Sequence, residues 1–236
     1  MLVTTLLYVS MPWLTSALGL HSQIAFGTLT SIAFLVAIGA ALVGVWREGY
    51  ALLSREMRER MWLHWPKGWR HWLLAVGVFA IAAVIIVVIG TPLSKLLASV
   101  PGFIPPEWVP DTINPLVDVD PENPFPGITL AGNWGFVVIY IGVLILNILG
   151  EELYFRGLIL PKMQGVFGRW DWVANGSLWA LFHSFIRWNY PLLLPGTLGI
   201  AFIARKTRSV YAVMLIHFIF NSIPVLGVLP LVLEAT

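Results

Sequence analysis

The chain has 236 residues, of which 58% are hydrophobic and only 11% are charged, and its formal net charge is +2. A soluble domain carries about a quarter charged residues, so this composition indicates an integral membrane protein. The absence of cysteine excludes a disulfide framework and a cysteine nucleophile, and the lack of a basic arm or glycine-rich phosphate loop argues against nucleic acid as a partner.

Apolar runs of about 20 residues, the length that crosses a bilayer as a helix, recur along the chain. The predicted spans cover residues 2–20, 24–46, 72–93, 134–160, 172–187, 192–204 and 210–229. Pro12 is expected to kink the first span and Pro161 to end the fourth. Asp171 and Ser209 are expected to be the N-caps of the fifth and seventh. We therefore predict an all-α fold, a polytopic transmembrane helical bundle with about seven spans.

Two segments between the spans differ from them in composition. Residues 47–71 hold six Lys or Arg beside several tryptophans, which is typical of a segment at the level of the lipid headgroups, with a short surface helix before Pro66. Residues 99–133 are rich in proline and acidic residues and contain no Lys or Arg, which predicts an outer loop without long helices.

The distribution of positive charge predicts the orientation. If residues 47–71 are cytoplasmic and each later span crosses once, eleven of the fourteen Lys and Arg residues lie on the cytoplasmic side. Lys95 and Arg187 are then outside, and Arg156 lies within the membrane. This follows the positive-inside rule and predicts a multi-pass protein of the plasma (inner) membrane with a cytoplasmic N-terminus.

The fourth span carries three charged residues, Glu151, Glu152 and Arg156, where each charge costs about 3 kcal/mol to insert. Glu152 and Arg156 are four residues apart, so they are expected to form an ion pair along one helix face. Glu151 is rotated by about 100° from Glu152, so it is free to face a cavity. Asn147, one turn before Glu151, either lines the same cavity or packs between helices.

Other polar residues are predicted to lie at the depth of Glu151. At a rise of 1.5 Å per residue from the cytoplasmic helix ends, Glu151, His183 and His217 lie roughly 15, 18 and 12 Å deep. Asn221 is one turn beyond His217 on the same face. A Glu–His pair suits general base catalysis on a water molecule, and His217 and Asn221 can donate hydrogen bonds to an oxyanion. Two histidines and a glutamate can also bind zinc, an alternative that stays open beside the metal-free site that we favour.

Three ordered motifs carry a family resemblance: Glu151-Glu152-x-x-x-Arg156, Trp179-x-x-x-His183 and His217-x-x-x-Asn221. Together they resemble the CAAX protease and bacteriocin-processing family, also called CPBP or ABI, which includes the prenyl-protein endopeptidases. The resemblance covers about residues 134–225 and departs from the family at Trp179, where phenylalanine is more common.

The resemblance implies a role for each matched residue. Glu151 and His183 would activate water, His217 and Asn221 would stabilise the oxyanion, and Glu152 and Arg156 would orient and neutralise the site, without a cofactor. It also implies two parts of the chain. Residues 1–133 would hold the N-terminal spans with segments 47–71 and 99–133, and residues 134–236 the catalytic helical core.

Three functional hypotheses follow. The first is an intramembrane endopeptidase that hydrolyses a membrane protein or peptide substrate, lipidated or CAAX-like, at the lipid bilayer. The second is a non-catalytic scaffold or immunity-type protein that binds a peptide or partner at the same cavity. The third is a transporter or channel whose Glu and His carry protons. The complete set of four candidate catalytic residues favours the enzyme, and the lack of an obvious inverted repeat weighs against the transporter.

Overall fold

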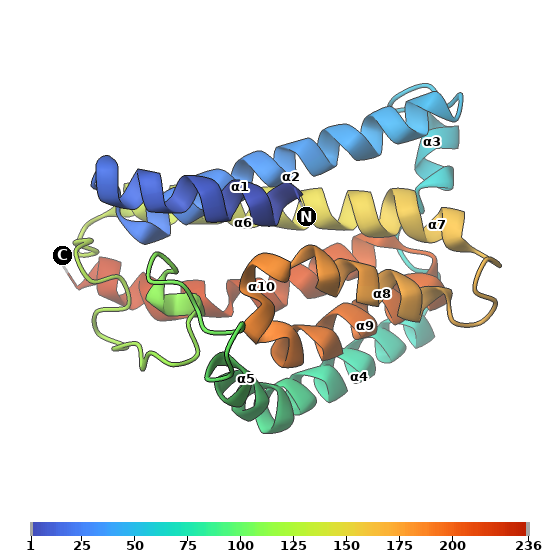
Figure 1. Ribbon diagram of the computed structural model, residues 1–236. Coiled ribbons are helices and arrows are strands. Elements are labelled where there is room, and N and C mark those ends of the chain that lie inside the picture. Colours follow the sequence, from blue (N-terminus) through green and yellow to red (C-terminus); the bar gives the residue numbers. More distant parts are fainter. Residues whose placement is uncertain (1, 235–236) are drawn as a thin grey trace.

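The computed structural model describes residues 2–234, and every regular secondary-structure element within this range is a helix (Figure 1). This confirms the all-α prediction. The α-helices are α1 Leu2–Pro12, α2 Ser22–Arg47, α3 Arg55–Arg60, α4 Trp69–Ile85, α5 Thr91–Ala98, α6 Trp134–Glu151, α7 Leu160–Met163, α8 Asp171–Phe182, α9 Tyr190–Thr207 and α10 Val210–Leu233. The π-helical and 3-10 segments are η1 Trp13–Ala17, η2 Ile86–Gly90, η3 Asp111–Ile113, η4 Glu152–Ile159 and η5 Ser184–Asn189.

Four helical stretches are long and apolar enough to cross a membrane, judged by length and composition. They are Ser22–Arg47, Trp69–Ala98, Trp134–Met163 and Val210–Leu233. These stretches correspond to the second, third, fourth and seventh predicted spans. The predicted count of seven is therefore not confirmed.

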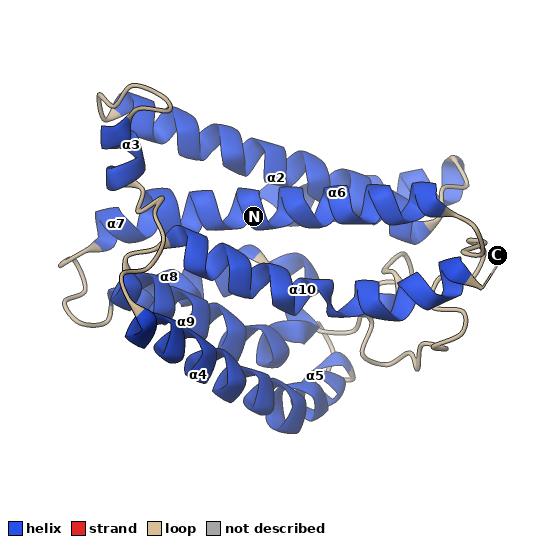
Figure 2. Cartoon of the chain, turned by 180° about the vertical axis from the view of Figure 1, so that it is seen from behind, coloured by secondary structure: helices blue, strands red, loops and turns tan. Residues whose placement is uncertain are grey.

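The other three predicted spans form shorter helices. Helix α1 has 11 residues, roughly 16 Å at the α-helical rise, and Figures 1 and 2 show it following only part of the length of the bundle. Helix α8 has 12 residues, which is roughly 18 Å at the α-helical rise and well short of a bilayer core. Helix α9 packs along α8, but it contains Pro195 and carries Arg205 and Lys206 in its last turn. The hydropathy of a run does not reveal where its helix breaks, as at the end of α8 inside the predicted span 172–187.

The two predicted N-caps differ in outcome. The Ser209 hydroxyl accepts a hydrogen bond from the Ala212 amide at 3.2 Å, as predicted for the cap of α10. The prediction for Asp171 was wrong, because Asp171 is the first residue of α8 rather than its cap. Its buried carboxylate accepts hydrogen bonds from the Gly165 and Phe167 amides, each at 3.0 Å. Asp171 thus stabilises the turn that leads into α8.

The predicted surface helix of residues 47–71 is α3, and an ion-pair cluster ties it to the bundle. Arg60 and Lys162 each place a nitrogen 2.7 Å from the Glu48 carboxylate, which joins α3 and α7 to the end of α2. Burial raises the pKa of Glu48, but hydrogen bonds and charge attraction from these two cations outweigh it and hold the pKa below its usual range.

Residues 99–133 form a loop in which η3 is the regular element, as the proline content predicted. Figure 1 shows this loop at the end of the bundle opposite α3 and α7. Trp188 and Asn189 of η5 donate side-chain hydrogen bonds to the Ile113 carbonyl, at 3.0 and 3.1 Å. The loop is therefore tied to the segment that follows α8.

Candidate active site

A π-helix begins at the predicted motif. Helix α6 ends at Glu151, and η4 continues as eight π-helical residues from Glu152 to Ile159. Side chains from other helices donate hydrogen bonds to backbone carbonyls of this wider turn. Asn175 donates to the Phe155 carbonyl at 2.9 Å, and Arg60 donates to the Gly157 and Leu158 carbonyls, each at 3.4 Å. Such donors stabilise an irregular turn in an apolar helix, because its backbone groups keep their hydrogen bonds.

The predicted ion pair forms at the start of this π-helix. Arg156 Nη1 lies 3.4 Å from Glu152 Oε1, and both side chains are fully buried. The guanidinium also lies 3.8 Å from the Trp179 ring centroid and donates to the Thr197 carbonyl at 3.4 Å. The positive charge is thus held by a carboxylate, an aromatic face and a carbonyl oxygen.

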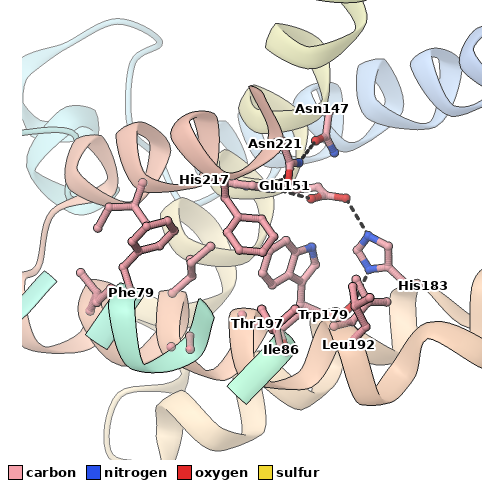
Figure 3. Close-up of a pocket in the computed structure, with 18 residues that line it drawn as sticks. Phe79, Ile86, Asn147, Glu151, Trp179, His183, Leu192, Thr197, His217 and Asn221 are labelled. Atoms are coloured by element: carbon pink, nitrogen blue, oxygen red, sulfur yellow. Dashed lines mark hydrogen bonds and ion pairs between the residues drawn. The ribbon is translucent and has the colours of Figure 1, made fainter. Parts of the chain in front are cut away.

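Glu151 and His183 face each other, although they belong to different helices. His183 Nε2 lies 3.2 Å from Glu151 Oε1 (Figure 3). The structure corrects the position of His183, which is the C-cap of α8 rather than a residue within a span. His183 Nδ1 lies 2.9 Å from the Trp179 carbonyl, so this nitrogen carries a hydrogen. The imidazole is therefore held with Nε2 facing the Glu151 carboxylate.

His217 and Asn221 lie on the other side of Glu151. His217 Nε2 is 3.8 Å from Glu151 Oε2, and His217 Nδ1 is 2.9 Å from Glu152 Oε1. Asn221 Nδ2 lies 2.9 Å from His217 Nε2 and donates to Asn147 Oδ1 at 2.9 Å (Figure 3). The structure therefore brings all six predicted site residues, and Asn147, into one connected network.

This network borders a cavity of about 110 Å³. Glu151 lines the cavity and Glu152 does not, as their different helix faces predicted. Apolar side chains from α4 and α9, among them Phe79 and Leu192, line much of the remainder. This contribution was not predictable from the sequence, because an apolar residue in a membrane helix carries no signal that separates a cavity wall from a lipid-facing surface.

Asn175 is a second residue whose position was not predicted. It is fully buried on α8, where its side-chain amide donates a hydrogen bond to a carbonyl of the π-helix.

Within residues 2–234, no group of three or more His, Cys, Asp or Glu side chains is arranged to hold a metal ion.

A bundle of apolar helices around a buried Glu–His network defines the class of protein: a membrane protein with a polar site in its interior. Residues 133–223 match the family described as Type II CAAX prenyl endopeptidase Rce1-like, the family that the motifs of this segment resemble. The family implies a protease, and together with the four apolar helices it indicates an integral membrane protein. Comparison with curated proteins and with solved structures found no match.

Proposed function

We propose that the protein is an intramembrane endopeptidase that hydrolyses a peptide bond by water activated at Glu151 and His183. The observation that carries this proposal is the 3.2 Å approach of His183 Nε2 to the buried Glu151 carboxylate at a mostly apolar cavity. Ionisable side chains are costly to bury in a membrane helix, and where they occur in pairs they gather at functional sites.

The contacts support a general-base step. A water beside Glu151 donates one hydrogen to the carboxylate, and its oxygen attacks the carbonyl carbon of the scissile bond. The O–H bond breaks as the C–O bond forms, and the proton passes to the Glu151–His183 pair. Collapse of the tetrahedral intermediate breaks the C–N bond, and the same proton is transferred to the leaving amine. The sequence of steps consumes one water and leaves the pair in its starting state.

His217 and Asn221 are proposed to stabilise the oxyanion. Their side chains lie next to the Glu151 carboxylate, on the side away from His183, and contact each other at 2.9 Å. Glu152 accepts from His217 Nδ1, which orients the imidazole, and Arg156 offsets the charge of the two buried carboxylates. Glu152 and Arg156 are thus assigned to orientation and charge balance rather than to contact with the substrate.

The proposed substrate is a membrane protein or peptide, lipidated or CAAX-like, that enters the cavity from the bilayer. The apolar walls from α4 and α9 suit a hydrophobic segment or chain, while a water-soluble peptide gains little there. We propose that no metal takes part, since Glu151 is already engaged by His183 and Glu152 by His217.

The test compares cells that carry wild-type protein, Glu151→Ala or the control Glu107→Ala, an acid in the outer loop. N-termini of membrane proteins are mapped in each, with expression and folding verified. A new N-terminus present with wild type and with Glu107→Ala, but absent with Glu151→Ala, is the expected result, and it names a substrate. Identical maps from all three folded proteins would refute proteolysis and favour the non-catalytic scaffold.

A further inference from the structure

Two buried polar atoms at the cavity have no hydrogen-bond partner, and they are complementary. Among the described residues that line it, Glu151 Oε1 is an unpaired acceptor and Trp179 Nε1 is an unpaired donor. Oε1 makes the ion contact with His183 but no hydrogen bond with it. The Trp179 side chain is only 4% exposed, so bulk solvent does not satisfy its N–H. A buried N–H without an acceptor is unfavourable and calls for an occupant.

The indole of Trp179 is held in one orientation by its neighbours. Arg156 lies 3.8 Å from its ring centroid, and the rings of His217 and His183 meet it edge-on at 5.2 and 5.7 Å. Figure 3 shows the nitrogen-bearing edge of the indole turned toward the side of the cavity where Glu151 and His183 lie. The unpaired N–H is therefore a fixed feature of the site.

Other donors at the cavity are already engaged. Asn221 Nδ2 faces Asn147 Oδ1 and His217 Nε2, and His183 Nδ1 faces the Trp179 carbonyl. His217 Nδ1 faces Glu152. Among these cavity donors, the indole N–H is thus the one that has no hydrogen-bond partner within the protein.

We propose that Trp179 Nε1–H holds the nucleophilic water against Glu151. One water satisfies both unpaired atoms, since it accepts from the indole and donates to Glu151 Oε1. This inference rests on the proposed function. The inference assigns a role to the indole N–H of Trp179. Phenylalanine, which is more common in the family at this position, cannot play this role, because a phenyl ring has no N–H or O–H donor.

The chemistry follows from the two lone pairs of the water oxygen. One lone pair accepts the indole hydrogen bond, and the other is left to attack the carbonyl carbon as Glu151 takes the proton. The indole transfers no proton, so its contribution is to orient the attack. Because the indole touches the water rather than the substrate, its loss lowers kcat and leaves KM unchanged.

The test replaces Trp179 with β-(3-benzothienyl)alanine, which keeps the shape of the indole and has sulfur in place of N–H. Turnover of the substrate found by N-terminal mapping is expected to fall about tenfold in kcat, the effect of one hydrogen bond in the transition state. KM and thermal stability stay at their wild-type values. The same replacement at Trp188, a buried indole bonded to the Ile113 carbonyl away from the cavity, leaves kcat unchanged.

An ultraviolet resonance Raman difference spectrum, wild type minus the Trp179 variant, gives a readout that needs no substrate. It is expected to show a hydrogen-bonded indole N–H, and a free N–H would overturn the inference. Wild-type kcat in the variant would overturn it as well, as would a fall in kcat matched by a loss of stability. Activity in Glu151→Ala would instead refute the proposed function, so the two failures are distinct.

Discussion

The replacement Arg156→Leu tests whether the buried charges of the site depend on one another. Arg156 and Glu152 are fully buried and lie 3.4 Å apart, and Glu151 is buried beside them. Removing one partner of a buried pair costs about 3–5 kcal/mol, because the other charge is left without compensation. The loss of the cation–π contact between Arg156 and Trp179 is included in this cost. We expect Arg156→Leu to lose about 3–5 kcal/mol of unfolding free energy.

A double-mutant cycle with Glu152→Gln separates the lost charge from the lost packing. The glutamine keeps an acceptor for His217 Nδ1 while removing one uncompensated carboxylate. The double variant should recover about 1–3 kcal/mol relative to the sum of the two single variants. The assay is reversible unfolding in mixed detergent and dodecyl sulfate micelles, followed by tryptophan fluorescence.

The control has the same four-residue spacing in an exposed setting. Arg55 and Glu59 form an ion pair at 2.8 Å on the surface of α3. Arg55→Leu should change the unfolding free energy by less than about 1 kcal/mol. If the costs of Arg156→Leu and Glu152→Gln simply add, or if Arg156→Leu costs no more than Arg55→Leu, the buried charges of the site are not coupled.

Three further predictions concern packing, pH and metal. Gly150→Ala should lower stability by about 1–3 kcal/mol, because its Cβ would lie 2.9 Å from the Phe34 backbone oxygen. Gly142→Ala in the same helix meets no atom within 4 Å and should be neutral or stabilising; equal thermal shifts in the two variants would contradict the close packing. The lowered pKa of Glu48 predicts stability that is present above the ordinary value of 4.5 and is lost as pH falls through the folded-state value. The difference in unfolding free energy between wild type and Glu48→Gln should therefore shrink in acid, and a difference that is constant with pH would rule this out. Chelators should leave kcat unchanged, whereas loss of turnover that zinc restores would establish the metal alternative.

Much of the protein was predictable from local sequence. The apolar runs predicted α2, α4, α6 and α10 as long helices, because the hydropathy of each run is a property of its own residues. The proline-rich composition of residues 99–133 predicted a loop for the same reason. The orientation inferred from the Lys and Arg residues stays a prediction.

The candidate site was predictable in its membership. Charged and polar residues are costly in a membrane helix, so Glu151, His183, His217 and Asn221 stood out against an apolar background. Their spacing along the chain also carried the family motifs, which the family match over residues 133–223 bears out. Their chemical roles stay predictions.

Tertiary structure decided how these residues meet. The π-helix after Glu151 depends on donors from Asn175 and Arg60, which are distant in sequence. The end of α8 at His183 and the unpaired N–H of Trp179 likewise depend on the helices packed around them. A hydropathy pattern reports the preference of each residue for the bilayer, whereas a helix break or an unpaired donor is set by which groups from other helices come within hydrogen-bond distance.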